Sequence, residues 1–246
     1  SGKGSGGSAA TVIGGSAVHM ALNEFIASGK SVAAGVFGCN ADAIRFESGL
    51  FHHSWDESKA PMDWADIASH SNMAGGLSVL GEFLPPDVTY PNGCHICEVE
   101  IDPATGRVSF ADYVVVEDVG TVLNQDLVEG QMHGGIAQGI GQALGEILRY
   151  DSTGQLITGS FMDYQMPIAA DLPNFRVSTI AVPTKINPLG AKGVGEAGTV
   201  GSLAATMNAV VDAMASVGVT NFEMPATPHR VWQALNAVKL CNKMPI

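Results

Sequence analysis

The sequence is poor in charge, and above all in positive charge. Only 15% of its 246 residues are charged, and 12 Lys and Arg stand against 24 Asp and Glu, which gives a formal net charge of −12. Because proteins that bind nucleic acid neutralise phosphates with clustered Lys and Arg, this balance argues against a nucleic-acid partner. A hydrophobic content of 46% beside so few charges also suggests that partner subunits cover much of the surface.

Long apolar runs are missing as well. No stretch approaches 18 uninterrupted apolar residues, and the opening residues, SGKGSGGSAA, lack the apolar stretch that follows the charge in a signal peptide. We therefore expect a protein without a membrane span that is soluble and cytoplasmic.

Cysteines are few and scattered. The four of them, Cys39, Cys94, Cys97 and Cys241, do not suit a disulfide framework in a chain of this length. Cys94 and Cys97 form a C-x-x-C inside an alternating apolar pattern typical of a strand, and no second pair completes a four-thiolate zinc site. We expect buried strand cysteines in preference to a metal or redox pair.

Glycine, in contrast, is abundant and concentrated in three segments, residues 2–26, 130–148 and 193–218. A helical pattern of small residues follows each glycine cluster. In the third segment, apolar residues recur at three- and four-residue steps, which predicts one buried helix face before a stop at Gly218. The residues of this predicted face are Val200, Leu203, Ala204, Met207, Val210, Val211 and Met214.

Strand patterns lie between the glycine-rich segments. Residues 94–118 have the pattern of two strands joined by a short turn, residues 149–160 repeat this device around Asp151 to Gly154, and residues 175–182 form a further strand. Because helices and hairpins are mixed without regular alternation, the predicted fold class is α+β, and a doubly wound parallel sheet is disfavoured. We expect residues 1–246 to form a single domain, with a division into two subdomains left open.

The stretch GVGEAG, residues 193–198, satisfies the G-x-G-x-x-G string of a dinucleotide-binding loop. That loop requires a strand that ends directly at the first glycine. Here the predicted strand ends at Val182, and Pro183 and Pro188 intervene. Glu196 would also place a carboxylate beside a pyrophosphate. A nicotinamide-dependent dehydrogenase is therefore disfavoured.

Two interpretations of the glycine loops remain open. Helix starts carry free N–H groups, so three converging loops would form a cradle for one large, phosphate-bearing molecule. Alternatively, glycine and alanine only let the helices pack closely. Glu196 favours the first interpretation, because its neighbours Val194, Ala197 and Val200 are small or apolar and predict a poorly solvated carboxylate suited to a general base. A glutamate in a first helical turn is also favoured by the helix dipole alone.

Three long motifs together resemble a known family. They are GSGGSAATVIGG, VEDVGTVLNQDLVEGQMHGGIAQGIGQAL and AKGVGEAGTVGSLAATMNAVVDA. In this order and spacing they are similar to the carboxy-terminal half of the molybdenum-binding large subunit of the xanthine dehydrogenase and aldehyde oxidase family of molybdenum hydroxylases, in its bacterial branch. The similarity runs from Lys3 to Leu235 and implies the fold of the second molybdopterin-binding domain of these enzymes.

The resemblance implies a role for Glu196 as the family's general base. That base takes a proton from a molybdenum-bound water or hydroxide, whose oxygen then enters an electron-poor C–H bond of an N-heterocycle or an aldehyde while the hydride passes to a sulfido ligand of molybdenum. The positions that match the family's cofactor-binding residues are Ser5, Gly6, Gly7, Ser8, Thr11, Gln138, Gly195 and Glu196.

The resemblance also implies the cofactors and partners. Molybdopterin, expected in its cytosine dinucleotide form, holds molybdenum through its dithiolene, so no side chain is expected to bind the metal, and His52, His53 and His133 are expected to be packing or surface residues. The role of Lys192 is left open. The family further implies an amino-terminal half of the molybdenum subunit, an iron–sulfur subunit and a flavin (FAD) subunit as partners, without which this chain is not expected to turn over. A non-catalytic scaffold subunit and a carbon monoxide dehydrogenase type of enzyme are the alternatives.

Overall fold

The computed structural model describes residues 4, 6–71 and 77–241, and the chain divides into two compact units. Unit 1 comprises Ser1–Ala9, Thr89–Lys185 and Gly190–Ile246, and unit 2 comprises Ala10–Val88 and Ile186–Leu189. Helices and strands are mixed along the chain, which confirms the α+β class. That the whole chain is one domain stays a prediction.

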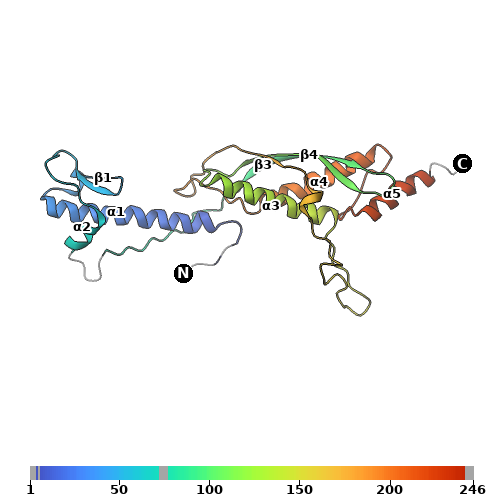
Figure 1. The fold of residues 1–246 in the computed structure, drawn as a ribbon, viewed down its shortest axis with the longest axis horizontal. Helices are drawn as coiled ribbons and strands as arrows, with labels where there is room; N and C mark the ends of the chain where they lie inside the picture. The colour runs from blue at the N-terminus through green and yellow to red at the C-terminus, as the bar shows by residue number, and fades with distance from the viewer. Residues whose placement is uncertain (1–3, 5, 72–76, 242–246) are drawn as a thin grey trace. The chain divides into compact units, whose positions relative to one another are not determined.

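Unit 1 is built on a three-stranded sheet with the order β3-β4-β5 (Figure 1). The predicted hairpin is confirmed as β3 (Asn92–Ile101) and β4 (Val108–Asp118), which pair antiparallel. The predicted strand at residues 175–182 is shorter, as β5 (Arg176–Thr179), and it pairs with β4 in parallel, an arrangement that the sequence patterns did not indicate. The second predicted hairpin is reduced to a single bridge between Tyr150 and Leu156.

Three helices of unit 1 bury their apolar faces against one another and against the sheet. They are α3 (Gln125–Leu144), α4 (Ala197–Ala215) and α5 (Pro228–Cys241), and a short 3₁₀ turn, η3 (Ala169–Asp171), precedes β5. Side chains of β4 and α3 form one hydrophobic core, and side chains of α4 and α5 form another. Helix α4 lies against both α3 and β3, so it is the central element of the unit (Figure 1).

Helices α3 and α4 approach each other backbone to backbone. A Cβ atom added at Gly198 would lie 2.7 Å from the carbonyl oxygen of Met132, and one added at Gly135 would lie 3.0 Å from the amide nitrogen of Thr199. Contacts this short exclude any side chain larger than hydrogen. Gly135 and Gly198 therefore serve close helix packing, which was one of the two interpretations left open.

The buried stripe of α4 differs in part from the predicted helix face. Its buried residues recur every four positions and are Gly198, Ser202, Thr206, Val210 and Met214. The prediction is right for Val210 and Met214 but wrong at the start of the helix, where Val200 is 71% exposed. Close contact with α3 admits only small residues there, and the buried Ser202 and Thr206 were not part of the predicted face. The predicted stop is confirmed by Gly218, which has a φ of 95°.

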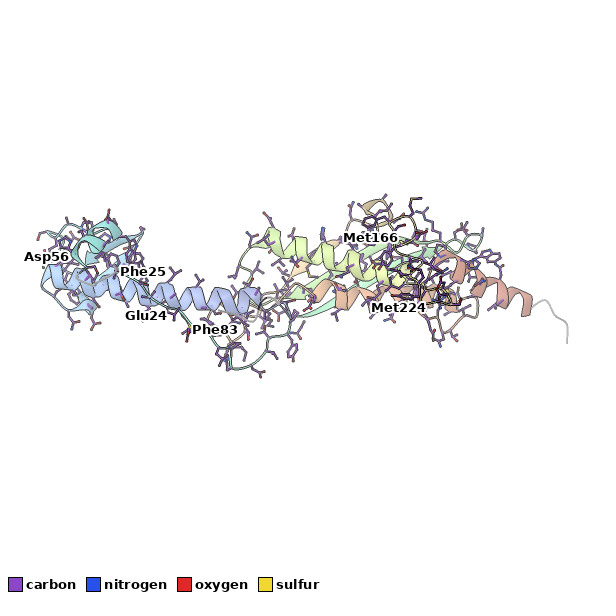
Figure 2. The ribbon with its side chains drawn as sticks, turned by 90° about the horizontal axis from the view of Figure 1, so that it is seen from below. Glu24, Phe25, Asp56, Phe83, Met166 and Met224 are labelled. Atoms are coloured by element: carbon purple, nitrogen blue, oxygen red, sulfur yellow. The ribbon has the colours of Figure 1, made fainter. Side chains whose placement is uncertain are left out.

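Unit 2 is smaller and is centred on one long helix. The π-helical turn η1 (Thr11–Gly15) leads into α1 (Ser16–Phe37), which continues well beyond the predicted segment. The remaining elements are the 3₁₀ turn η2 (Ala41–Ala43), the antiparallel pair β1 (Ile44–Glu47) and β2 (Leu50–His53), and α2 (Trp64–His70). Its core is aromatic: Phe25 of α1, labelled in Figure 2, stacks on Trp64 with ring centroids 4.5 Å apart, and Phe51 meets the same indole edge-on.

We expect Gly139→Ala to destabilise the chain by about 1 to 3 kcal/mol, because the added methyl group overlaps Oγ of Ser202 and lies 2.8 Å from the carbonyl oxygen of Thr199. The matched control is Gly134→Ala in the same helix, where an added Cβ meets nothing within 4 Å. The control should instead gain about 0.5 to 1 kcal/mol from reduced backbone entropy. Denaturant unfolding of both variants measures the difference, and equal stabilities would contradict the packing described above.

Candidate functional site

Two segments from opposite ends of the sequence meet in unit 1 at a single hydrogen bond. The Oγ atom of Ser8 donates to Oε2 of Glu196 at 2.9 Å, although the two residues are 188 positions apart. The loop that precedes α4 is thereby joined to the first glycine loop, as expected if the two motifs form one site. Both residues belong to unit 1.

Glycines permit this contact. A Cβ atom added at Gly193 would lie 2.5 Å from the carbonyl oxygen of Ser8, and one at Gly195 would lie 2.9 Å from Oγ of Ser8. The first loop can therefore lie against the second only because the second has no side chains at these positions. Ser8 itself has a φ of 54°, a left-handed conformation that is uncommon outside glycine, directly after Gly7 with a φ of 57°.

The core of unit 1 fixes both sides of Glu196. Val194 and Ala197 pack against the hydrophobic cluster that includes Tyr113 and Ile136, so the backbone on either side of the glutamate is anchored. Glu196 is the residue at which α4 begins, and the amide groups of the first helical turn have no acceptor within the helix. The local structure thus presents one carboxylate beside several backbone donors.

An ion pair also anchors the part of this loop that precedes Glu196 in the sequence. Nζ of Lys192 donates to Oδ2 of Asp118 at 2.5 Å, with only 11% and 15% of the two side chains exposed. Oδ1 of Asp118 accepts from the amides of Gly120 and Val182 at 2.9 and 3.1 Å. The role of Lys192, which the sequence left open, is to tie the loop that leads to Glu196 to the end of β4.

This network also sets the charge state of Asp118. Burial opposes the charged form, but the hydrogen bond from Lys192 and those from the two amides together hold the pKa of the Asp118 carboxyl below its usual range. The carboxylate therefore stays ionised, and the ion pair persists, at all but strongly acidic pH.

Helix α3 contributes two glutamines near the start of α4. Oε1 of Gln138 accepts from Oγ1 of Thr199 at 3.0 Å, and the same hydroxyl lies 3.1 Å from the carbonyl oxygen of Gly135. Gln131 was not predicted, yet its Oε1 lies 3.6 Å from the position of a Cβ built on Gly195. The signal that could have identified Gln131 is its seven-residue spacing from Gln138, which places both on one face of a helix.

The remaining predicted cofactor-binding residues fall in different places. Gly6 and Gly7 are exposed, and a Cβ added at either would meet nothing within 4 Å, so their backbone faces open space. Thr11 is exposed and opens η1 in unit 2. Ser5 lies outside the described residues.

The expectation of a poorly solvated Glu196 is wrong for this chain. Glu196 is exposed, as are Gly195 and Val200. Val194 and Ala197 are indeed small or apolar, but they pack against the hydrophobic core and leave the carboxylate exposed to solvent. Among the described residues, the hydroxyl of Ser8 contacts this carboxylate.

The histidines that were expected to be packing or surface residues fit that expectation. His133 is exposed and meets the ring of Phe175 edge-on, with centroids 5.5 Å apart. His53 is half-buried beside Phe37 and Trp55. Across residues 4, 6–71 and 77–241, no three His, Cys, Asp or Glu side chains gather in a way that could hold a metal ion.

The cysteine expectation is right about the strand but wrong about burial at one position. Cys94 and Cys97 both lie on β3, and three steps along a strand place them on opposite faces of the sheet. Cys94 is exposed, whereas Cys97 packs against the core, and burial raises the pKa of its thiol to about 11. The two sulfur atoms therefore do not face each other.

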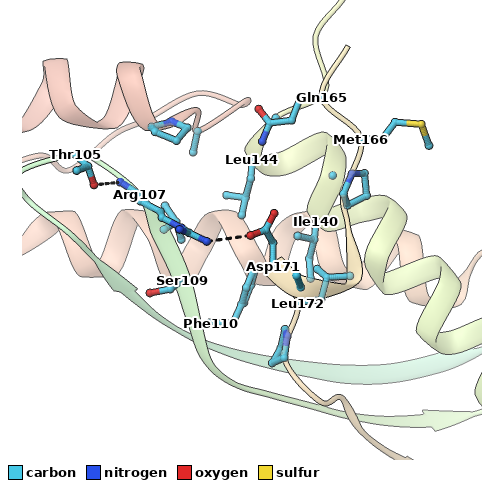
Figure 3. Close-up of a pocket in the computed structure, with 18 residues that line it drawn as sticks. Thr105, Arg107, Ser109, Phe110, Ile140, Leu144, Gln165, Met166, Asp171 and Leu172 are labelled. Atoms are coloured by element: carbon cyan, nitrogen blue, oxygen red, sulfur yellow. Dashed lines mark hydrogen bonds and ion pairs between the residues drawn. The ribbon is translucent and has the colours of Figure 1, made fainter. Parts of the chain in front are cut away.

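A pocket of about 650 Å³ lies elsewhere in unit 1, at the carboxyl end of α3 (Figure 3). Ile140 and Leu144 line it, and an exposed ion pair between Arg107 and Asp171, 3.0 Å long, lies at its edge. None of the predicted site residues that the structure describes lines this pocket. The candidate site is therefore the exposed loop around Glu196 and not this pocket.

The chain belongs to a family of molybdopterin cofactor-binding domains, whose model matches residues 1–173. It is 37% identical to the carbon monoxide dehydrogenase large chain of Hydrogenophaga pseudoflava, over 95% of this chain and 30% of the relative. It is also 37% identical to the nicotine 6-hydroxylase large subunit of Paenarthrobacter nicotinovorans, over 96% of this chain and 30% of that subunit. The resemblance seen in the motifs is thereby confirmed.

Solved structures agree with this family. A crystal structure of a Cu,Mo-containing CO dehydrogenase matches with a TM-score of 0.89 and 30% identity, over 97% of this chain and 31% of that one. Quinoline 2-oxidoreductase from Pseudomonas putida 86 matches with a TM-score of 0.86 and 33% identity, over 96% and 31% of the two chains. The chain thus spans about 30% of the length of the curated relatives that it matches. In the described part of the chain, no helix has the length and apolar character needed to cross a membrane.

We expect Lys192→Met to destabilise the chain at neutral pH by about 1 to 3 kcal/mol, because it leaves the half-buried Asp118 carboxylate without its cation. The folded-state pKa of Asp118 is below its unfolded value, so this stabilisation is full above the unfolded value and is lost as pH falls through the folded one. The difference between variant and wild type should therefore shrink in strong acid. Unfolding at several pH values measures this, with Arg107→Met as the control, since its exposed pair is worth less than about 1 kcal/mol. A difference that grows on acidification would contradict the assignment.

Proposed function

We propose that this chain is part of the molybdenum catalytic subunit of a multi-subunit hydroxylase or dehydrogenase, in which Glu196 acts as the general base. The observation that carries the proposal is the hydrogen bond between Ser8 and Glu196, because it joins two of the three family motifs at one carboxylate. Membership of the molybdopterin cofactor-binding family supports it.

The residues around Glu196 fit a phosphate-bearing pterin. Gly6 and Gly7 present backbone to open space, next to a serine hydroxyl and the amide groups at the start of α4. A pterin that brings its own dithiolene needs hydrogen-bonding partners for its polar edges and not a metal-binding side chain. We assign Ser5, Gly6, Gly7, Ser8, Gln138 and Gly195 to this contact, and the pyrophosphate of a cytosine dinucleotide form suits the helix starts.

When bound, the molybdenum pterin supplies the two-electron acceptor of the hydroxylation. Glu196 takes up a proton in the same reaction. The hydroxyl of Ser8 occupies Oε2 and orients the carboxylate, so Oε1 is the atom that receives the proton from water. Gln138 and Thr199 hold the first turn of α4, which fixes the direction of this carboxylate.

The substrate that we propose is an electron-poor C–H group of an N-heterocycle or an aldehyde. The similarity to a nicotine 6-hydroxylase and to quinoline 2-oxidoreductase supports an N-heterocycle. A carbon monoxide dehydrogenase type of enzyme is the second candidate, because the similarity to the carbon monoxide dehydrogenase large chain is equally high. The partners would be the rest of the molybdenum subunit, an iron–sulfur subunit and an FAD subunit.

We predict that Glu196→Gln in the assembled enzyme retains molybdenum but lowers turnover by about 10²- to 10⁴-fold, because the amide keeps the volume of the side chain and loses the base. Metal analysis and steady-state kinetics give the two values. The control is Glu223→Gln, at another exposed glutamate, which should leave both unchanged. Near-normal turnover of the Glu196 variant would refute the assignment, and absence of molybdenum from the wild-type assembly would indicate a scaffold subunit.

We further predict that Gly6→Leu loses the cofactor although the chain still folds, since a Cβ at this position meets nothing within 4 Å. Molybdenum and released cytosine nucleotide should both fall to a small fraction of the wild-type content, with unchanged circular dichroism. Gly130→Leu on α3 is the control, because a Cβ at Gly130 also meets nothing within 4 Å. Full cofactor content in the Gly6 variant would place the cofactor elsewhere.

A further inference from the structure

A chain of buried polar groups runs beneath α4. His95 of β3 and Glu117 of β4 form a buried hydrogen-bonded pair in which Nε2 lies 3.0 Å from Oε1, with side chains only 4% and 5% exposed. Nδ1 of the same imidazole lies 2.7 Å from the hydroxyl of Tyr113. Register explains the arrangement: His95 lies opposite Val115, so its ring reaches diagonally to the residues on either side of that position.

Burying such a cluster costs folding free energy, so its presence requires an explanation. Removing polar side chains from water costs free energy that the hydrogen bonds between them only partly return. Tyr113 is a buried neutral partner, because burial, with smaller contributions from Cys97 and Glu117, raises the pKa of its hydroxyl. All three groups lie on the face of the sheet that α4 covers, so α4 is the element that they can hold in place.

Two glycines make room for the pair. A Cβ atom added at Gly201 of α4 would lie 2.5 Å from Cδ2 and 2.7 Å from Cε1 of His95, so the imidazole touches the helix backbone itself. A Cβ added at Gly93 would overlap the carboxyl group of Glu117. The pair is thus enclosed between β3 and the second turn of α4, five positions after Glu196.

The opposite side of these turns is held by α3. Gly198 touches the backbone of α3, and Thr199 donates to Gln138. The first two turns of α4 are therefore fixed from two sides, by a helix backbone and by an imidazole. The direction in which the helix starts determines where Glu196, the residue that precedes Ala197, presents its carboxylate.

We propose that His95 and Glu117 are positioning residues that hold the first two turns of α4, and through them Glu196, in the geometry needed for proton transfer. Neither residue touches a substrate or a cofactor in this role. The effect of these residues on catalysis rests on the function proposed above, whereas their effect on the position of α4 does not.

The test on the chain itself is amide hydrogen exchange of three variants. Glu117→Leu removes the charge and the acceptor, Glu117→Gln keeps an acceptor, and Thr206→Val is the control, because Thr206 is also buried on α4 but further along. We expect exchange of the helix-bonded amides from Val200 to Ser202 to accelerate about tenfold in Glu117→Leu, less in Glu117→Gln, and not at all in the control. Acceleration spread evenly to Met214 would reflect general destabilisation and would overturn the proposal, as would unchanged exchange.

The second readout uses the assembled enzyme. Displacement of the base should lower kcat of Glu117→Leu about ten- to hundredfold with KM and molybdenum content unchanged, and Glu117→Gln should recover part of the loss. A fall in molybdenum content or a change confined to KM would overturn the proposal. If Glu196→Gln remains active, the proposed function fails while the exchange result still decides whether the pair holds α4. If Glu196→Gln is inactive but exchange is unchanged, the positioning role alone fails.

Discussion

The backbone contact between α3 and α4 is the constraint on which the rest of unit 1 depends. Gly135 and Gly198 bring the two helices so close that a methyl group at either position would overlap the other helix. Packing of this kind leaves little freedom of rotation or translation, because backbone atoms cannot move aside as a flexible side chain can. The start of α4 is therefore determined by the sequence of a helix that lies more than fifty residues earlier in the chain.

Glu196 inherits its position from this packing. The loop before it is tied to β4 through Lys192 and Asp118, and the helix after it is tied to α3 and to the imidazole of His95. A carboxylate on a loop would ordinarily sample many directions, whereas one at the end of a helix held from two sides samples few. Ser8 then needs to supply only one hydrogen bond to orient the group. Buried contacts thus determine the position of the exposed carboxylate.

The sequence predicted the local elements well and the contacts between them poorly. The hairpin of β3 and β4 and the helices α1, α3 and α4 follow from periodicity and turn residues, and the stop at Gly218 follows from a local need for positive φ. The parallel pairing of β5 and the small-residue stripe of α4 depend on which elements meet, and periodicity contains no information on that. The motifs identified Glu196, but its exposure could not be derived from its neighbours, since small residues can either cover a carboxylate or lie beneath it.

The exposure of Glu196 and the low charge of the chain have a common physical basis in the proposed assembly. Phe161 and Met162 are 89% and 94% exposed, and apolar side chains of this size ordinarily lie in a core or an interface. A surface that is both poor in charge and rich in such residues is unfavourable in water, and its burial by another chain lowers the free energy. The same burial would exclude water from a carboxylate that the chain leaves open, and in a drier environment a fixed hydroxyl and fixed amide groups act more strongly on charge. The base would then be positioned by this chain and desolvated by its partners, so neither alone would suffice for catalysis.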